Sequence, residues 1–575
     1  MSACRSIGTV SRSFQISSGS RPSENSATVA GWSSSATSRR PAKSPSAIML
    51  RSSGSRMGLA VDIREVLHSP RRFRTPQGAA GSLPPVRGRA RLQKTSFRTV
   101  STMPNMASPE APADRPPTEK IRVAVAGCLL AAAAALLSGP AAAADDAAAR
   151  GWEHLRQRAY LPPDFDQEVF EALPEVWEQP SRDQAAAASP HERRRMAFRR
   201  YGLTPDPRDP TRPLQYVVGA DGSWTMSCLA CHQGQVGGRS IPGLPNSNYA
   251  LETLTEEVRL VKVRQRKAFG HMDYGSLLLP LGTTVGTTNA VIFGVALMQH
   301  RDRDLQIVSR PPRFDMAHHD MDAPPWWHYA KKRQLYADGF APKGHRMLMQ
   351  FLLVKENGPQ RFREWEDEFR EIEAWIESLQ PPAWPGTIDR GLANRGRGLF
   401  REHCGSCHGE YARRGTAGRD TYPARIVPID EIGTDRLRFD SLTPANRRDL
   451  NESWFGHYGE AGGIDEPEGY LAPPLDGIWA TAPYLHNGSV PTLWHLLHPG
   501  KRPTVWKRSP EGYDDERVGL EIESFTKLPS GVKRASQRRW YFDTTRPGKG
   551  AAGHDYPDVL DEDDKRAVLE YLKTL

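Results

Sequence analysis

Three stretches of the chain repeat their apolar residues with the period of an α-helix. The apolar positions are Ile372, Trp375, Ile376 and Leu379 in the first stretch, Leu392, Leu399 and Phe400 in the second, and Val568, Tyr571, Leu572 and Leu575 in the third. Spacings of three and four residues gather such side chains on one face of a helix. The sequence therefore predicts helices over residues 362–379, from Asp389 into Cys404, and at the C-terminal end.

Proline and glycine interrupt the rest of the chain, which contains 48 and 49 of these residues. Both residue types break regular elements. Two further helices are predicted over His191–Tyr201 and Leu251–Lys262, residues 219–224 are predicted to form a turn, and the weakly charged residues 282–298 are predicted to be buried. We expect a mainly α fold with long irregular loops and little β.

Two short motifs each combine a pair of cysteines with a histidine. They are Cys228, Cys231 and His232 in the first, and Cys404, Cys407 and His408 in the second. This spacing is the attachment signature of c-type haem, because the two thiols add to vinyl groups on one porphyrin edge and the adjacent imidazole then lies beneath the iron. The sequence predicts two covalently bound c-type haems.

Other uses of a Cys-x-x-Cys pair are zinc ligation, a disulfide or a thioredoxin-like redox pair. The haem interpretation is favoured because both copies carry histidine directly after the second cysteine and because an export signal precedes them. The other two cysteines, Cys4 and Cys128, lie in segments that we expect the mature protein to lose.

The positive net charge of +10 comes from the N-terminal segment. Residues 1–102 contain 17 Lys and Arg against 3 Asp and Glu, which leaves the remaining 473 residues at −4. This balance argues against a nucleic-acid partner. The segment has no sustained period and is typical of a disordered extension. The alternative, which we prefer, is that translation starts at Met103 or Met106, because a signal sequence follows.

Residues 103–144 have the parts of a secretory signal peptide. A basic run, Lys120-Ile121-Arg122, precedes the apolar stretch 123–137 and the small residues 138–144, with cleavage predicted after Ala144. The apolar stretch is too short for a transmembrane span. A lipoprotein signal is disfavoured because Cys128 precedes most of the apolar core. Since c-type haem is attached outside the bacterial cytoplasm, we expect a periplasmic or secreted protein without a membrane span in the mature chain.

Large aromatic rings gather between Pro311 and Pro342, among several prolines and histidines. Such a cluster is compatible with ordinary core, because rings bury much apolar area. Rings on irregular, proline-interrupted backbone also line ligand pockets. We select Trp326, Trp327 and Phe340 as candidate catalytic-pocket residues.

The predicted domains are an N-terminal haem domain over residues 145–385 and a C-terminal cytochrome c domain over residues 386–575. A helix that enters the second motif and a terminal helix that closes the chain resemble the cytochrome c fold, in which these helices cross near a glycine and aromatic rings. Gly396, Phe400 and Tyr571 match that crossing.

The segment from Ala472-Pro473-Pro474 through Tyr484-Leu485-His486-Asn487-Gly488 resembles the signature shared by di-haem cytochrome c peroxidases and di-haem rubber oxygenases. Pro324-Pro325-Trp326-Trp327 between the motifs, and Gly553-His554 near the end, are closer to the rubber oxygenase branch. The resemblance covers most of residues 150–575. Its motifs are more specific for the superfamily than for a substrate.

The resemblance implies a role for each haem. It makes His232 the proximal ligand of an N-terminal haem that leaves one axial position for dioxygen, and His408 the proximal ligand of a haem held by two histidines. His554 is our choice for the second of these because it closely precedes the closing helix. His486 is the other candidate, and its structural alternative is a hydrogen bond within the Asn487-Gly488 turn.

Three functions follow as hypotheses from the predicted haems. The first is an exported oxidoreductase that uses dioxygen to cleave an apolar alkene such as polyisoprene. The second is an electron-transfer cytochrome without turnover, and the third is a hydrogen peroxide reductase. The expected partners are a small or apolar polymeric substrate, dioxygen or peroxide, and a redox partner protein.

Overall fold

The computed structural model describes residues 140–309, 317–412 and 419–575. The predicted N-terminal extension and the apolar part of the predicted signal peptide lie outside these ranges. Helix α3 (Pro140–Gln157) runs through the predicted cleavage site after Ala144. All described residues belong to one unit, Ala113–Leu575. None of the helices in these ranges combines the length and apolar composition needed to cross a membrane.

Strands are more abundant than the sequence predicted. The strands are β1 (Phe165–Asp166), β2 (Pro205–Asp206), β3 (Asp209–Pro213), β4 (Tyr216–Val218), β5 (Ser223–Met226), β6 (Gln235–Val236), β7 (Arg239–Ser240), β8 (Thr287–Thr288), β9 (Met321–Asp322), β10 (Gln334–Leu335), β11 (Ala341–Pro342), β12 (Ile426–Pro428), β13 (Gly469–Leu471), β14 (Val505–Asp514), β15 (Gly519–Phe525) and β16 (Tyr541–Asp543). The structure is 43% helical and 15% strand, a mixed α/β composition, so the predicted mainly α fold with little β is wrong. The physical reason is that turns which break helices also bring neighbouring segments into short antiparallel pairs.

Most helices are short. They are α4 (Gln167–Ala172), α5 (Ser181–Ala187), α6 (Pro190–Tyr201), α7 (Leu229–His232), α8 (Leu251–Gln265), α9 (His271–Leu278), α10 (Ala290–Met298), α11 (His345–Leu348), α12 (Pro359–Glu364), α13 (Glu366–Ser378), α14 (Arg390–His403), α15 (Gly405–His408), α16 (Ile429–Ile432), α17 (Leu437–Ser441), α18 (Pro444–Asn451), α19 (Leu493–Leu497), α20 (Ala535–Arg538) and α21 (Glu562–Leu572). The helices predicted as α6, α8, α14 and α21 are confirmed, whereas the one predicted over 362–379 divides into α12 and α13 at Trp365.

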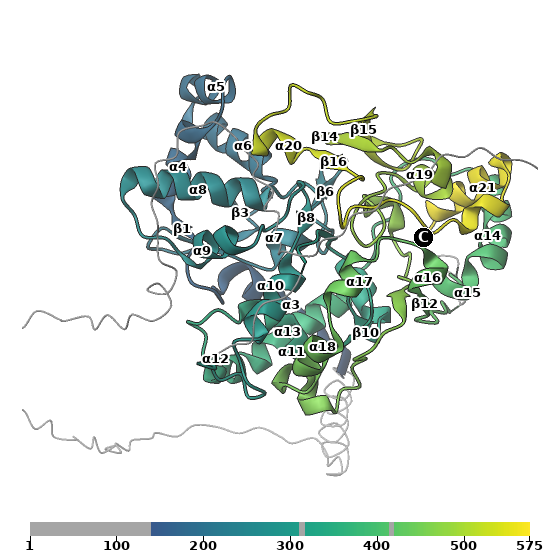
Figure 1. The fold of residues 1–575 in the computed structure, drawn as a ribbon, viewed down its shortest axis with the longest axis horizontal. Coiled ribbons are helices and arrows are strands. Elements are labelled where there is room, and N and C mark those ends of the chain that lie inside the picture. The colour runs from purple at the N-terminus through teal and green to yellow at the C-terminus, as the bar shows by residue number, and fades with distance from the viewer. Residues whose placement is uncertain (1–139, 310–316, 413–418) are drawn as a thin grey trace, which may run out of the picture. The chain divides into compact units, whose positions relative to one another are not determined.

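Helix α14 and the terminal helix α21 cross beside the second haem motif, and Figure 1 shows them side by side. A Cβ atom at Gly396 would lie 1.9 Å from the Ala567 carbonyl oxygen, so only glycine permits this approach. The Phe400 and Tyr571 rings meet with centroids 5.3 Å apart. The predicted crossing at these residues is confirmed.

A second helix pair, α3 with α13, crosses in a similar way. A Cβ atom at Gly151 would lie 2.0 Å from the Glu371 carbonyl oxygen. Next to this glycine, the Trp152 and Trp375 rings stack with centroids 4.9 Å apart. Each haem motif is thus accompanied by a glycine-mediated helix crossing.

The two halves of the chain share their cores. Leu442, Leu450 and Phe455 pack in the core built mainly from residues before 377. In the opposite direction, Leu244 and Trp327 pack in the core built mainly from residues after 399. The structure therefore does not show the predicted layout of two separate haem domains.

The longest strands form the antiparallel sheet β15-β14-β16, which the sequence analysis did not predict. Trp506 of β14 pairs with Ser524 of β15 and with Phe542 of β16. The Trp506 and Phe542 rings stack with centroids 5.0 Å apart. The alternation of Leu520 and Ile522 with charged residues was the available signal for a strand here.

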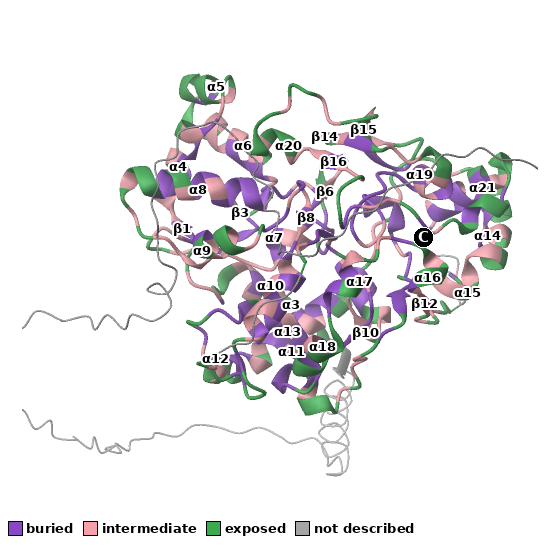
Figure 2. Cartoon of the chain, in the orientation of Figure 1, coloured by how far each residue is buried: buried purple, intermediate pink, exposed green. Residues whose placement is uncertain are grey.

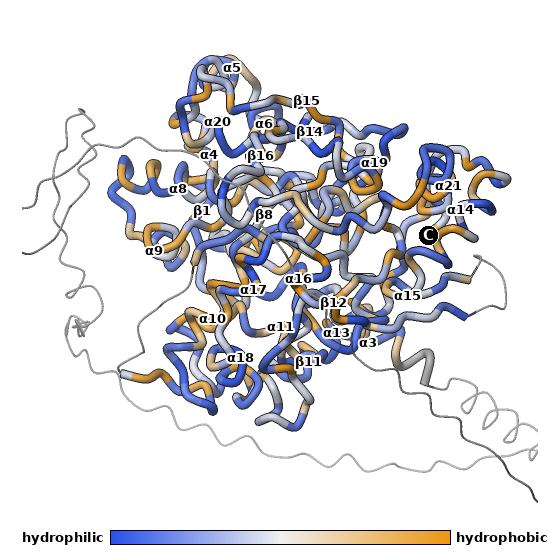
Figure 3. Tube along the Cα trace, turned by 45° about the vertical axis from the view of Figure 1, so that its right-hand side comes forward, coloured by the Kyte–Doolittle hydropathy of each residue, from blue (hydrophilic) through white to orange (hydrophobic). Residues whose placement is uncertain are grey.

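Apolar and polar faces are not fully separated at the corner formed by α8 and α9. Figure 2 shows α8 buried in its N-terminal part, whereas its exposed residues lie toward its C-terminal end. The exposed residues of this corner nevertheless include Leu260, Val263, Leu277 and Leu278. Figure 3 shows the resulting hydrophobic segments at α8 and α9.

Candidate haem sites

The first Cys-x-x-Cys-His motif follows a strand rather than a helix. Strands β4 and β5 form a hairpin whose turn covers residues 219–222 of the turn predicted over 219–224, whereas Ser223 and Trp224 belong to β5. Cys228 then caps the single turn of α7 that contains Cys231 and His232. A spacing of three residues on a helical turn puts the two thiols on one side.

Both thiols of this motif are free and partly accessible. Burial raises the pKa of Cys228 to about 11 and that of Cys231 to about 12. The Thr288 side chain in β8 interacts with the Cys231 thiol and opposes this rise of its pKa. Strand β8 therefore contacts the motif directly.

The His232 imidazole is held by a backbone carbonyl. Its Nδ1 donates to the Pro324 carbonyl oxygen at 3.1 Å, which leaves Nε2 as the nitrogen with an available lone pair. Burial lowers the pKa of His232 to about 3, so the ring is neutral. A neutral imidazole whose other nitrogen donates to a carbonyl is the usual state of a metal-ligating histidine.

The second motif has the same construction. Helix α14 leads into Cys404, which caps the turn α15, and burial raises the pKa of this thiol to about 12. His408 Nδ1 donates to the Pro473 carbonyl oxygen at 2.9 Å. Burial lowers the pKa of His408 as well.

The two carbonyl acceptors belong to matching segments. Pro324 stands in Ala323-Pro324-Pro325 and Pro473 in Ala472-Pro473-Pro474. Each segment follows a short strand, β9 in the first case and β13 in the second. In both, the residue after the acceptor is a proline, which lacks an N–H and keeps the backbone extended. The chain thus builds the same histidine support twice.

His554 faces His408. The centroids of the two rings lie 6.2 Å apart with an interplanar angle of 60°. Two metal–nitrogen bonds of about 2 Å, with the half-width of a ring on either side, put two axial imidazole centroids roughly 6 Å apart. This distance fits a pair of ligands on opposite sides of one iron.

The surroundings of His554 also fit a ligand. Its Nδ1 is buried without a hydrogen-bond partner, and its backbone N–H donates to the Ile432 carbonyl oxygen at 2.7 Å. Burial, followed by the proximity of His408 and Arg502, lowers the pKa of His554 to about 3. The ring is therefore neutral and positioned by its backbone.

The other candidate ligand, His486, lies against a different residue. Its ring packs on the Tyr470 ring with centroids 4.4 Å apart. Burial, followed by the charges of Arg438 and His319, lowers its pKa to about 3. Its carbonyl oxygen accepts from the Asp322 N–H at 2.9 Å. The structure brings His554, and not His486, into the ring-pairing distance of His408 described above.

The three predicted pocket residues have three different environments. The Trp326 ring stacks on the His232 ring at 4.3 Å between centroids and at 16°. Trp327 donates from Nε1 to the Asp476 carbonyl oxygen at 2.7 Å. Phe340 stacks on Tyr336 at 4.9 Å between centroids. Their contact with a substrate stays a prediction.

Trp326 and Trp327 connect the two histidine sites. They begin the 3-10 helix η2 (Trp326–Lys331), and the His328 Nε2 in the same helix donates to the Asp476 carbonyl oxygen at 2.8 Å. Asp476 is three residues beyond Pro473, the acceptor for His408. One short helix thus contacts His232 on one side and the His408 loop on the other.

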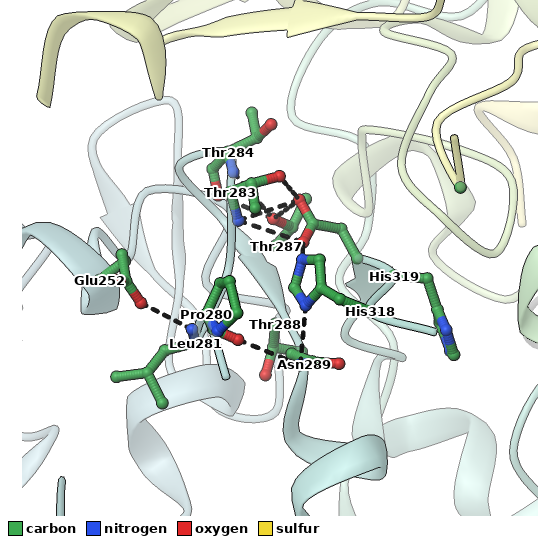
Figure 4. Close-up of polar contacts among 12 residues, drawn as sticks. Glu252, Pro280, Leu281, Thr283, Thr284, Thr287, Thr288, Asn289, His318 and His319 are labelled. Carbon is green, nitrogen blue, oxygen red and sulfur yellow. Dashed lines mark hydrogen bonds and ion pairs between the residues drawn. The ribbon is translucent and has the colours of Figure 1, made fainter. Parts of the chain in front are cut away.

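A buried carboxylate that the sequence analysis missed fixes the strand before Pro324. The Asp320 oxygens accept from Thr283 Oγ1 at 2.7 Å, Thr287 Oγ1 at 2.8 Å and His318 Nε2 at 3.1 Å, and they pair with Lys549 Nζ at 2.9 Å. Figure 4 shows this network, in which His319 points away from the other labelled residues. Lys549 is far from Asp320 in the sequence, so no local spacing of residues could predict this site.

The network also sets the charge of Asp320. Burial alone would raise the pKa of its carboxyl group, but Lys549 and the hydrogen bonds from His318 and Thr283 outweigh burial and hold the pKa well below its usual range. The carboxylate is therefore ionised. Because β8 and β9 pair beside it, Asp320 supports both the Thr288 contact to Cys231 and the Pro324 carbonyl.

Two titratable side chains between the motifs have strongly shifted pKa values although both keep some accessible surface. Burial raises the pKa of Asp322 well above its usual range and lowers that of Lys332 to about 8.

Residues 469–507 match the family model described as RoxA-like, cytochrome c-like. The matched stretch contains Pro473, which holds His408, and the segment around His486. The match supports a RoxA-like cytochrome family, a c-type haem and a cytochrome or haem-based oxidoreductase role.

Two curated relatives come from Sinorhizobium fredii (strain NBRC 101917 / NGR234). The chain is 31% identical over 261 residues to the uncharacterized protein y4iJ. The aligned region covers 34% of this chain and 41% of y4iJ. It is 30% identical over 239 residues to the uncharacterized protein y4iM, and that aligned region covers 35% of this chain and 52% of y4iM. The chain spans about half, or less, of the length of these relatives.

Proposed function

We propose that this protein is a haem oxidoreductase with two c-type haems, one attached at Cys228 and Cys231 and the other at Cys404 and Cys407. The support is the repeated donor set: two free thiols and a neutral imidazole whose Nδ1 donates to a proline carbonyl oxygen. When bound, haem supplies one-electron transfer and the activation of dioxygen or peroxide.

The single observation that carries the proposal is the 6.2 Å separation of the His408 and His554 rings. Two axial histidines leave no position for a substrate, so this site is suited to electron transfer. His408 is oriented by Pro473 and His554 by its backbone bond to Ile432, so both rings are held before any cofactor arrives. We propose that this second site passes electrons.

We propose that the His232 site is the reactive one and that the reaction is dioxygen-dependent cleavage of an apolar alkene such as polyisoprene. The RoxA-like match favours this class. In this role His232 holds the cofactor from one side, and Trp326 fixes the imidazole by stacking. Apolar rings such as the buried Phe340 would help to exclude water from a bound substrate.

Reduction of hydrogen peroxide is the second candidate. This reaction consumes protons, and Asp322 lies two residues before Pro324. Burial raises the pKa of its carboxyl group well above the usual range, which favours the protonated form. The phenyl and indole rings of the candidate pocket residues favour an apolar substrate, whereas the Asp322 carboxyl group favours hydrogen peroxide as the substrate.

Product analysis separates the two reactions. The purified protein is incubated with polyisoprene and dioxygen, and separately with hydrogen peroxide and an electron donor. Oxygenated cleavage products from the polymer support the first reaction. Peroxide consumption without polymer cleavage supports the second. If neither activity is observed and both haems are six-coordinate and low-spin, the result favours an electron carrier without turnover.

We also propose that the protein acts in the periplasm or outside the cell, because c-type haem is attached outside the bacterial cytoplasm. Fractionation of a host that matures c-type cytochromes tests this. Haem-containing protein in the periplasmic or culture fraction supports export, and haem-free protein confined to the cytoplasm contradicts it.

A further inference from the structure

Two arginines share one aspartate in the interior of the protein. Arg438 of α17 and Arg447 of α18 contact the two oxygens of Asp338 at 3.1 Å and 3.0 Å. The exposed fractions of these residues are 1%, 3% and 0%. All three are therefore removed from water.

The charges of this cluster do not balance. Two guanidinium groups face one carboxylate, and burial, followed by the charge of Arg438, lowers the pKa of the neighbouring His319 to about 4. One positive charge is left over among these described residues. A buried charge without a partner is strongly destabilising, so a bound anion would offset a large cost.

The hydrogen bonds of the cluster are incomplete as well. Nε and Nη1 of Arg438, Nε of Arg447 and Nε2 of His319 are all buried without a partner. His319 Nδ1 contacts its neighbouring Ala317 carbonyl oxygen at 3.0 Å, and Figure 4 shows this ring turned away from the Asp320 network. Buried donors without acceptors are rare in native proteins and call for a ligand or an ion.

The shape of the unpaired donors selects the ligand. The unpaired Nε of Arg438 shares one edge of the guanidinium with Nη2, which also contacts Asp338, and such an edge forms a planar fork that matches the two oxygens of a carboxylate. The unpaired Nη1 lies on the other side of the group. The same guanidinium lies 5.7 Å from the centroid of the Phe340 ring, which stacks on Tyr336. The fork thus lies against Phe340, one of the candidate pocket residues.

We propose that Arg438, supported by Arg447, is a buried carboxylate-binding site. The carboxylate is either a haem propionate or the carboxylate of a small soluble acid. The first of these sources rests on the proposed haem, and the second does not. Both sources use the same fork and the same surplus charge.

The test uses the full-length protein after its haem content has been measured by mass. Arg438→Gln removes the fork and the charge, and Arg438→Lys keeps the charge and removes the fork. Arg436→Gln is the matched control, because Arg436 lies two residues away, is exposed and pairs with Asp440 at 2.8 Å on the surface. Three readouts are used: the haem propionate bands in resonance Raman spectra, the haem midpoint potentials, and the melting temperature during titration with acetate.

If a propionate fills the site, Arg438→Gln and Arg438→Lys shift the propionate bands, and Arg438→Gln also lowers one midpoint potential, because the loss of a positive charge favours ferric iron. If a soluble acid fills it, acetate raises the melting temperature of the wild type in a saturable way, and both variants lose that response.

The proposal is overturned if both Arg438 variants match the wild type and Arg436→Gln in Raman bands, potentials and acetate response. If Arg438→Gln does not fold, Arg438→Lys and the acetate titration of the wild type give the same decision. A protein without haem would refute the proposed function, and the acetate titration would still decide whether the site binds a carboxylate.

Discussion

The imidazole rings of His408 and His554 face each other at 6.2 Å between centroids, although one follows the second cysteine pair and the other lies shortly before the terminal helix. The separation is the one that two axial ligands of a single iron require. It turns a choice between two histidines, His554 and His486, into a testable assignment.

Replacement of His554 by alanine is expected to convert the second haem from low-spin to high-spin, because the iron loses one axial nitrogen. The ferric absorption spectrum measures this change, and added imidazole should restore the low-spin spectrum. His486→Ala is the control and should leave this haem low-spin. The assignment fails if His486→Ala opens the haem and His554→Ala does not.

Two glycines of α14 should respond oppositely to alanine. At Gly396 the new Cβ atom would meet the Ala567 carbonyl oxygen, so Gly396→Ala should cost at least about 1–3 kcal/mol of the free energy of unfolding through overpacking. At Gly398 no atom lies within 4 Å, so Gly398→Ala should gain up to about 1 kcal/mol from helix propensity. Urea unfolding measures both. Equal losses in the two variants would argue against the crossing.

Asp320→Asn should lower the free energy of unfolding by about 3–5 kcal/mol at pH 7, because Lys549 stays buried without its carboxylate. The pKa of Asp320 is depressed in the folded protein, so its stabilisation is present above about pH 4, the unfolded value, and is lost as the pH falls toward the folded value.

Urea unfolding between pH 7 and pH 3 checks this dependence. The variant should lose less stability over that interval than the wild type does. An Asp320→Asn protein as stable as the wild type at pH 7 would refute the role given to the network.

Trp327→Phe should cost about 1 kcal/mol of stability through the loss of the Nε1 bond to Asp476. It should also slow electron exchange between the two haems, because η2 contacts both histidine sites. Trp479→Phe is the comparison, since Trp479 is outside η2 and its Nε1 donates to a different acceptor, the Pro382 carbonyl oxygen, at 3.0 Å. Rapid-reduction kinetics compare the variants. An equal effect of the two substitutions would remove Trp327 from the electron path.

Local spacing predicted the parts of this protein that local geometry decides. Cys404, Cys407 and His408 follow a helix whose apolar face was visible in the sequence, and the crossing at Gly396 follows from the same pattern. The His408–His554 pair was anticipated through a family resemblance and not from spacing, because no period links residues so far apart.

The remainder depended on contacts between distant segments. Asp320 meets Lys549, and Asp338 meets Arg438 and Arg447, across long separations in sequence. The predicted fold class failed for a related reason. Strands of two or three residues form only where a turn brings a partner alongside, so their sequences carry too few residues to show a period of two.

Intact-mass measurement of the purified full-length protein, from a host that matures c-type cytochromes, tests the central claim most directly. The account predicts the mass of the polypeptide plus two haems. After Cys404 and Cys407 are both replaced by alanine, it predicts the mass of the polypeptide plus one haem. A mass equal to the polypeptide alone would contradict it.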